Sequence, residues 1–292
     1  MIKVAYYNCS LEEFKDPIKG KPFSHNLDRF KITQNYEEAD LIFGYLDYLN
    51  CNQDYDKISR SEIFKTYAPK FVFYTMHDNP KFAYRDMLST KIVCQPLTLD
   101  TNTFNIIPCP LQMRHFELEM IQDQEYIEKC RNVTKKYDLF FKGQIRYQNR
   151  HKIVEQDYGN LITYFETTQP IWNVKGKERV NLIKDFNLEM AHSKFSFCPR
   201  GSGSSSFRFF HSLMVGSVPI ISGHTRLPFE NEIHYENICI MLDHNENDYV
   251  SKLRAKIESI DYDQMRLEGI EVWEKYFKIE NTDKHLFDKL KK

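Results

Sequence analysis

Residues 194–229 read KFSFCPRGSGSSSFRFFHSLMVGSVPIISGHTRLPF, and no other part of the chain says more about its fold. Its first part, 194–198, is short, largely apolar and followed by Pro199, which is typical of a buried strand. Residues 200–206 then carry little side-chain bulk and many backbone amides. Because a flexible linker would not be flanked so closely by buried elements, we interpret this part as a tight turn.

A helix is predicted to follow the turn. Its apolar positions recur at helical spacing and are Phe207, Phe210, Leu213 and Met214, which would share one face. Gly216 is expected to end the helix, and residues 218–221 to form the next buried strand. A turn of small residues that leads into a helix binds anions, because its free amides and the helix dipole both favour negative charge. Arg208, in the first turn, could hold a phosphate through two hydrogen bonds, so the segment predicts a pyrophosphate site.

The common nucleotide fingerprints do not fit this turn. Only Gly201 and Gly203 match the pattern G-x-G-x-x-G, since Ser206 occupies the third position. The chain also lacks the G-K-[ST] sequence of a P-loop.

Four short motifs resemble the exostosin-like family of inverting glycosyltransferases. They are FSFCPRG, SFRFFHS, GSVPII and LPF, in this order within residues 195–229, with Ser196 where the family has cysteine. Weaker similarity extends to residues 37–44 (EEADLIFG), 104–110 (FNIIPCP), 137–147 (YDLFFKGQIRY) and 257–277 (IESIDYDQMRLEGIEVWEKYF). The resemblance implies an α/β fold of GT-B architecture, in which two Rossmann-like, doubly wound domains face a cleft.

The order of predicted strands and helices agrees with such a fold. The predicted strands are 3–7, 41–45, 71–74, 92–94 and 106–107 in the first half, and 139–142, 161–164, 195–198, 218–221 and 238–241 in the second, with polar, helical residues 117–136 between the halves. This alternation favours parallel sheets with crossover helices. We expect an acceptor-side domain at 1–125, a nucleotide-sugar-binding domain at 126–265, and a C-terminal helix at 266–292 that could cross back to the first domain.

One residue departs from the family pattern at a functional position. His211 stands three residues after Arg208, where the family has a glutamate that the resemblance implies holds the ribose. The two residues lie at i and i+3, on the same helix face. A histidine could still hydrogen-bond a hydroxyl, although it lacks a fixed negative charge.

The predicted donor-binding residues lie in two segments. From the turn and helix they are Arg200, Gly201, Ser206, Phe207, Arg208 and His211, and from the loop after the predicted strand 139–142 they are Gly143 and Arg146. Arg150 could bind the donor or instead bridge parts of the structure. Two arginines and a helix N-terminus supply the charge that a metal would bring, so we expect no metal and no cofactor besides the nucleotide-sugar substrate.

The catalytic base is expected in the first half, on the acceptor side. Asp78 in YTMHDNP follows the predicted strand 71–74, and a carboxylate at the carboxyl end of a strand would face the cleft. His77 is an alternative base, and Asp47 comes third. Asp78 could instead cap a turn, as aspartates often do. His224 and Glu230, on either side of LPF, could contact the donor sugar.

Composition limits the remaining possibilities. The 292 residues carry a net charge of −1, which gives no reason to expect nucleic-acid binding. The seven cysteines show no C-x-x-C, so neither a disulfide framework nor a cysteine zinc site is expected, and Cys198 is interpreted as a buried structural thiol. The first ten residues read as a strand rather than a signal peptide, and no apolar run could span a membrane, so we expect a cytoplasmic protein. Asp261-Tyr262-Asp263 is similar to a D-x-D metal motif, but helix capping explains it better.

Three functions fit these observations. The first is transfer of a sugar from a UDP-sugar to a carbohydrate or other hydroxyl acceptor. The second is a non-catalytic module that binds a nucleotide sugar or glycan, for which His211 is the sequence support. The third is a nucleotide-sugar epimerase or dehydrogenase, which the missing third glycine disfavours.

Overall fold

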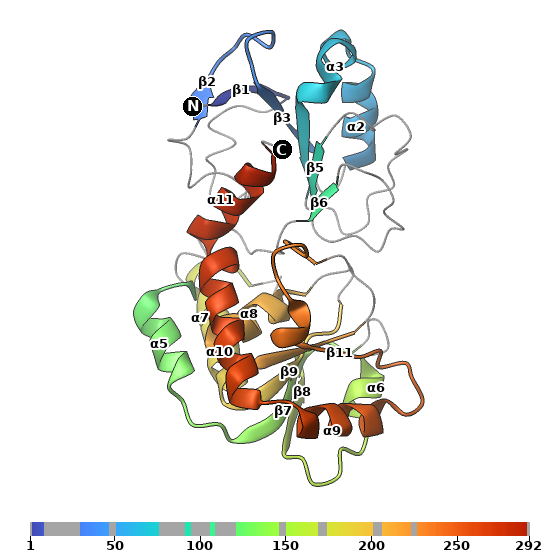
Figure 1. The fold of residues 1–292 in the computed structure, drawn as a ribbon, viewed down its shortest axis with the longest axis vertical. Helices are drawn as coiled ribbons and strands as arrows, with labels where there is room; N and C mark the ends of the chain where they lie inside the picture. Colours follow the sequence, from blue (N-terminus) through green and yellow to red (C-terminus); the bar gives the residue numbers. More distant parts are fainter. Residues whose placement is uncertain are drawn as a thin grey trace. The chain divides into compact units, whose positions relative to one another are not determined.

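The computed structural model describes residues 2–8, 30–46, 51–75, 91–94, 106–108, 121–145, 150–168, 174–200, 206–222 and 227–290. The chain divides into two compact units (Figure 1). Unit 1 comprises Met1–Pro110, Thr225–Pro228 and Ile279–Lys292, and unit 2 comprises Leu111–His224 and Phe229–Lys278.

Unit 1 is built on a sheet of six parallel strands in the order β2-β1-β3-β4-β5-β6. Its strands are β1 (Ile2–Tyr7), β2 (Phe30–Ile32), β3 (Leu41–Leu46), β4 (Phe71–Thr75), β5 (Lys91–Cys94) and β6 (Ile106–Pro108). The sequence predicts all of them except β2, whose three residues are too few to show an alternating pattern. Because β1 lies between β2 and β3, the strand order reverses there, as in doubly wound folds.

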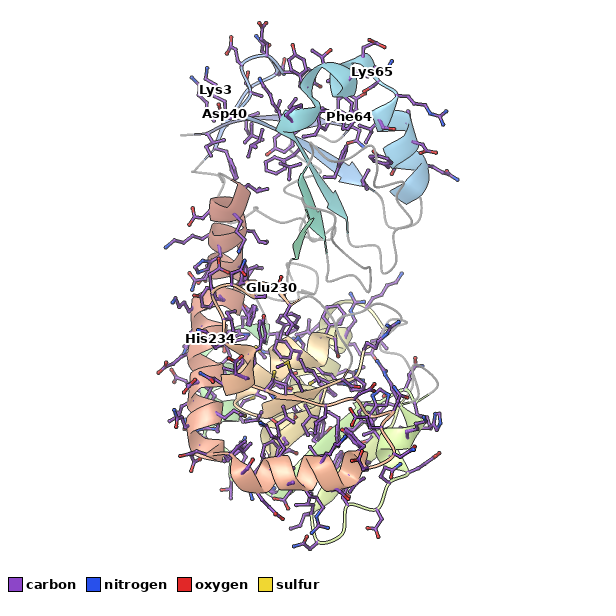
Figure 2. All side chains as sticks on the ribbon, turned by 45° about the vertical axis from the view of Figure 1, so that its right-hand side comes forward. Lys3, Asp40, Phe64, Lys65, Glu230 and His234 are labelled. Atoms are coloured by element: carbon purple, nitrogen blue, oxygen red, sulfur yellow. The ribbon has the colours of Figure 1, made fainter. Side chains whose placement is uncertain are left out.

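Three short helices follow β3 in unit 1. They are α2 (Cys51–Ser59), α3 (Glu62–Tyr67) and the 3₁₀ turn η2 (Ala68–Lys70). Helix α3 begins at Ser61, whose Oγ accepts a hydrogen bond from the Phe64 amide at 3.2 Å. The Phe64 ring packs against Phe71 of β4 with ring centroids 5.0 Å apart, whereas Lys65 lies at the surface (Figure 2). Helix α11 (Ile279–Leu290) also belongs to unit 1 and buries Ile279, Thr282, Leu286 and Leu290.

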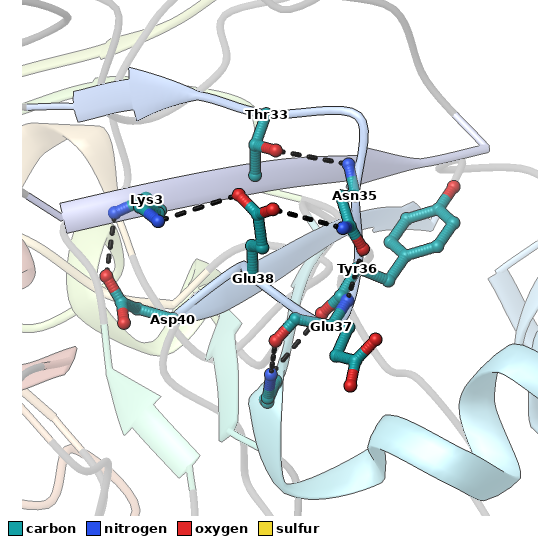
Figure 3. Close-up of polar contacts among 8 residues, drawn as sticks. Lys3, Thr33, Asn35, Tyr36, Glu37, Glu38 and Asp40 are labelled. Atoms are coloured by element: carbon teal, nitrogen blue, oxygen red, sulfur yellow. Dashed lines mark hydrogen bonds and ion pairs between the residues drawn. The ribbon is translucent and has the colours of Figure 1, made fainter.

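Residues 37–40, with the sequence EEAD, form part of a polar turn that leads into β3 (Figure 3). The Asn35 side chain accepts a hydrogen bond from the Glu37 amide at 3.0 Å, which is an Asx turn. Lys70 Nζ donates to the Glu37 carbonyl at 2.7 Å, and Asp40 Oδ2 accepts from the Lys3 amide at 2.7 Å. These bonds fix the start of β3 beside β1.

Unit 2 contains five parallel strands in the order β11-β10-β9-β7-β8. They are β7 (Tyr137–Gly143), β8 (Thr163–Thr167), β9 (Ser193–Phe197), β10 (Val218–Ile221) and β11 (Ile240–Met241). The first strand, β7, lies between β8 and β9, so the order reverses between β7 and β9. The predicted class of two Rossmann-like α/β units is confirmed.

Helices cover both faces of this sheet. On one face, α6 (His151–Val154) and α9 (Tyr249–Ser259) pack on Leu139 and Phe141. On the other, α7 (Gly176–Ala191) packs with Phe186 on Phe140 at a centroid distance of 5.7 Å. Helix α8 (Phe207–Val215) contacts α7, and α5 (Gln124–Arg131) and α10 (Tyr262–Val272) pack on α8 (Figure 1). The 3₁₀ turn Tyr235–Asn237 precedes β11, and α10 continues into a π-helical turn, Trp273–Phe277.

Several predicted boundaries are wrong, for local reasons. The strand expected at 161–164 begins at Thr163, because residues 161 and 162 still belong to the exit of the preceding turn. Of the helix expected over 117–136, the structure describes residues 121–136, in which α5 covers Gln124–Arg131 and is capped by Asp123 through the Tyr126 amide at 2.9 Å. Capping does explain Asp261, since its Oδ1 accepts from the Gln264 amide at 3.0 Å. Over the described residues, no helix combines the length and the apolar character needed to cross a membrane.

Helix α8 is more deeply buried than the sequence predicts. Instead of one apolar face, all residues from 209 to 215 are buried, because α5, α7 and α10 cover the side that faces away from the sheet. Gly216 ends the helix in the left-handed conformation with φ 70°, as its position predicted. A Cβ at Gly216 would lie 3.1 Å from both Arg266 Nε and Ile270 Cδ1, so this end of the helix is also crowded.

Replacement of Gly216 by alanine should therefore destabilise the protein more than the same change at Gly176. Both glycines have left-handed backbones, φ 70° and 62°, and a non-glycine residue in that conformation costs about 1–2 kcal/mol. A Cβ at Gly176 would meet no atom within 4 Å, so Gly176→Ala measures the backbone cost alone. Urea unfolding should show a larger loss of free energy of unfolding for Gly216→Ala, and equal losses would contradict the crowding argument.

Candidate functional site

The candidate site lies where the strand order of unit 2 reverses. In parallel sheets, ligands bind at the carboxyl ends of the strands beside such a reversal. Here Gly143 ends β7, residues 198–200 follow β9, and Ser206 begins α8. Of the predicted donor-binding residues, the structure describes Gly143, Arg200, Ser206, Phe207, Arg208 and His211. Arg146, Gly201, His224 and the candidate bases Asp78, His77 and Asp47 lie outside the described residues.

Arg208 reaches from α8 across to the end of β7. Its Nε and Nη2 donate hydrogen bonds to the Lys142 carbonyl at 3.2 and 2.9 Å. Its guanidinium carbon lies 5.1 Å from the ring centroid of Phe141 and 5.9 Å from that of Phe186. Hydrogen bonds to a carbonyl and two ring faces are all favourable to a cation, so they hold the charged group in place.

The Arg208 charge has no carboxylate partner among the residues that the structure describes. Burial lowers the pKa of Arg208, but arginine remains protonated in proteins. A partly buried charge without a counter-ion costs free energy, and a bound anion would recover it. Nη1 hydrogen-bonds no described residue, so its N–H groups are available to such an anion.

Gly143 leaves room for this guanidinium. A Cβ on residue 143 would lie 1.9 Å from Arg208 Nη2, well inside contact distance. The Arg208 side chain would have to shift, and its two hydrogen bonds to the neighbouring carbonyl would be strained or lost. The structure thus brings together Gly143 and Arg208, which the sequence placed in separate motifs.

The first turn of α8 has backbone amides that could bind an anion. Ser206 has an extended backbone, with φ −138° and ψ 129°, and its side chain does not cap the helix. The first amides of a helix have no intrahelical acceptor, and they lie at the positive end of its dipole. In this turn the Phe207 ring is partly exposed, with its centroid 6.5 Å from that of His211.

Arg150 stabilises the segments around the site. Its Nε and Nη2 donate to the Arg200 carbonyl at 3.1 and 2.7 Å, and its Nη1 donates to the Gln144 carbonyl at 3.1 Å. It therefore bridges the segments after β9 and β7, as one of its two predicted roles required. The Arg200 Nε is buried and has no hydrogen-bond partner in the described ranges, so a ligand could supply one.

His211 is buried and neutral. Its Nδ1 lies 2.9 Å from Asn187 Oδ1 of α7. Burial, and secondly the charge of Arg208, lower the pKa of His211 to about 4. The sequence analysis missed Asn187, although a signal existed: it is a polar residue in line with the buried Val180, Ile183 and Met190 of α7.

Three basic side chains bind the opposite end of α8. Arg131 Nε donates to the Met214 carbonyl at 2.8 Å, and Lys135 Nζ and Arg266 Nε donate to the Gly216 carbonyl at 2.7 and 3.2 Å. They satisfy carbonyls that the helix leaves unpaired and interact favourably with the negative end of its dipole. The helix is therefore fixed with its N-terminus at the site.

Other predicted residues have structural or surface positions. Cys198 is buried, and burial raises the pKa of its thiol to about 12, which agrees with a structural role. Glu230 is exposed on a turn (Figure 2). Within the described parts of the chain, no three His, Cys, Asp or Glu side chains are grouped as a metal site would require.

Comparison with known proteins gives a family match. Residues 97–257 match the family described as the exostosin GT47 domain. Exostosin-1 of Drosophila melanogaster is 30% identical over 94 residues, which are 32% of this chain and 12% of the fly protein.

Two solved structures show a weaker likeness. A glycosyltransferase from Rickettsia africae ESF-5 is 11% identical with a TM-score of 0.44, over 99% of this chain and 98% of the other. The pneumococcal O-GlcNAc transferase GtfA, solved with UDP and GlcNAc, is 7% identical with a TM-score of 0.39, over 85% of this chain and 57% of the other.

The low pKa of His211 predicts a pH-dependent stability. Between pH 4 and 6.5 the unfolded chain binds a proton at this residue that the folded protein does not, so stability falls as the pH falls through this range. From pH 7 to pH 5 this amounts to roughly 2 kcal/mol. In urea unfolding, the free energy of unfolding of His211→Gln should fall from pH 7 to pH 5 by about 2 kcal/mol less than that of wild type. A variant with the wild-type pH dependence would contradict the prediction.

Proposed function

The chain belongs to the exostosin GT47 family of glycosyltransferases, and we propose that it transfers a sugar from a UDP-sugar to a carbohydrate hydroxyl with inversion at the anomeric carbon. The family match supports the reaction class, and the sequence resemblance supports the donor. The single observation that carries the proposal is the Arg208 guanidinium, which lies at the N-terminus of α8 without a carboxylate partner among the described residues.

The site supplies what the departing nucleotide needs. When the bond between the anomeric carbon and the donor phosphate breaks, negative charge grows on the diphosphate. Arg208 Nη1 and Arg200 Nε, which hydrogen-bond no described residue, and the first amides of α8 could all donate to it. These donors are already in place, so little reorganisation is needed as the charge develops.

The transfer itself requires a proton acceptor. The acceptor oxygen bonds to the anomeric carbon, the bond to the diphosphate breaks, and the hydroxyl proton passes to a base. We propose Asp78 as this base, with His77 as the alternative. The support is their place after β4 (Phe71–Thr75), because side chains that follow a parallel strand lie at its carboxyl end.

A second function has one structural observation in its favour. The Asn187–His211 pair puts a neutral imidazole where the family has a glutamate, and this change would suit a module that binds a nucleotide sugar without turnover. Release of UDP from a UDP-sugar, with water or an acceptor, would distinguish the enzyme from the binder.

Replacement of Arg208 by alanine should weaken UDP binding tenfold or more. Loss of a charge-assisted hydrogen bond costs roughly 1.5–3 kcal/mol, and about 1.4 kcal/mol corresponds to a factor of ten. Arg266→Ala is the matched control, because Arg266 binds the opposite end of α8, and its loss should lower stability without changing UDP affinity. Equal UDP affinities of Arg208→Ala and wild type in calorimetry would remove Arg208 from the site.

Asp78→Asn should keep UDP-sugar binding and lose transfer. The substitution is nearly isosteric and removes the ability to accept a proton, which typically costs ~10²–10⁴-fold in rate. A product assay with an identified acceptor measures this. If Asp78 only caps a turn, the variant should lose stability and keep its turnover, and His77→Ala becomes the next test.

Transfer should survive treatment with EDTA. The site's arginines and helix N-terminus provide the positive charge that a metal would otherwise bring to the leaving group. Complete loss of activity in EDTA, restored by manganese, would disprove a metal-independent mechanism.

A further inference from the structure

A buried polar contact between α7 and α8 points to a further functional residue. Asn187 is 0% exposed, and His211 is 7% exposed. Such groups are costly to bury unless they hydrogen-bond one another, and here Asn187 Oδ1 and His211 Nδ1 are 2.9 Å apart. Leu213 and Met214 fill buried positions of the same helix by apolar packing alone, so stability does not require a polar pair here.

The Asn187 amide lies with its oxygen towards His211. Its Oδ1 is 2.9 Å from His211 Nδ1, whereas its Nδ2 is buried and has no hydrogen-bond partner among the described residues. The Tyr126 hydroxyl of the neighbouring α5 donates to the Lys184 carbonyl at 2.7 Å.

This orientation determines which ring nitrogen of His211 carries the proton. A carbonyl oxygen can only accept, so Nδ1 must be the N–H donor of the pair. The ring is neutral, because burial and the nearby Arg208 lower its pKa to about 4. Nε2 then carries a lone pair, and no described residue hydrogen-bonds it. Arg208 lies on the same face of α8, one turn towards the helix N-terminus.

We propose that Asn187 is a positioning residue that keeps the proton of His211 on Nδ1, so that Nε2 accepts a hydrogen bond from a hydroxyl of the nucleotide-sugar donor. This rests on the proposed function. A carboxylate at position 211 could also accept that bond, but it would lie at i+3 from Arg208 and could pair with its guanidinium. The neutral imidazole accepts the same bond and leaves the Arg208 charge to the diphosphate.

The direct test is the protonation pattern of the ring. Nitrogen-15 NMR of protein labelled at histidine distinguishes a proton on Nδ1 from one on Nε2, and His211→Gln identifies the His211 signals among those of the ten histidines. Wild type should show the proton on Nδ1 at pH 7, with or without UDP. A proton on Nε2 in wild type would overturn the proposal without any further variant.

Two substitutions of Asn187 separate positioning from packing. Asn187→Leu should release the ring, move the proton towards Nε2 and weaken UDP binding roughly tenfold, as loss of one good hydrogen bond would. Asn187→Asp keeps an acceptor but adds a charge, so His211 should become protonated near neutral pH. The ratio of the UDP affinities of Asn187→Asp and wild type should then differ between pH 6 and pH 8. The comparison with wild type removes the effect of UDP itself, whose terminal phosphate has a second pKa of about 6.

The described titratable groups near this pair keep their charge state between pH 6 and pH 8. Arg208 of α8 stays charged, and the buried Tyr126 and Cys130 of α5 stay neutral, because burial raises the pKa of both. A folded Asn187→Leu with the wild-type proton position and UDP affinity would overturn the proposal. If that variant does not fold, the same ratio of Asn187→Asp to wild-type UDP affinity at pH 6 and pH 8 would overturn it instead. Failure of wild type to bind UDP would refute the proposed function, while the proton position would still decide whether Asn187 orients the ring.

Discussion

The bond between the Arg208 guanidinium and the Lys142 carbonyl is the contact on which the candidate site depends. It joins α8 to β7 across the point where the strand order of unit 2 reverses. The position of the guanidinium also accounts for the type of three neighbouring residues. Gly143 leaves room for it, and Phe141 and Phe186 provide ring faces beside it. Because a neutral carbonyl and two rings hold this guanidinium, its positive charge can still attract an anionic ligand. A carboxylate partner would balance that charge.

Helix α8 links this contact to the rest of unit 2. Its C-terminal carbonyls accept hydrogen bonds from Arg131, Lys135 and Arg266. Its N-terminal amides lie at the candidate site. Burial lowers the pKa of Lys135 to about 7, because the charged form is unfavourable in this buried place. The hydrogen bonds from Lys135 Nζ to two backbone carbonyls offset part of this cost. The helix is thus oriented by polar contacts at both ends, while α5, α7 and α10 cover its sides.

Much of this arrangement was predictable from the sequence, because it is local. Strand β10, the start of α8 and its end at Gly216 follow from apolar spacing and a glycine within a few residues. The prediction of an anion site rests on the same stretch. The position of Arg208 relative to Gly143 could not be predicted in this way, since it depends on the pairing of β7 with β9 in the sheet. Asn187 was missed for the same reason: its partner is 24 residues away, and only helix packing brings them together. Residues 132–136 were wrongly included in the predicted helix, because polar composition does not show where a helix ends.

If the Arg208 charge, which has no carboxylate partner among the described residues, holds the diphosphate of a nucleotide, a crystal structure of the protein with UDP will show it. A phosphate oxygen should lie within hydrogen-bond distance of the Arg208 guanidinium and of the first amides of α8, with Arg208 still bound to the Lys142 carbonyl. UDP bound elsewhere, or a diphosphate at this place that makes no contact with Arg208, would contradict it.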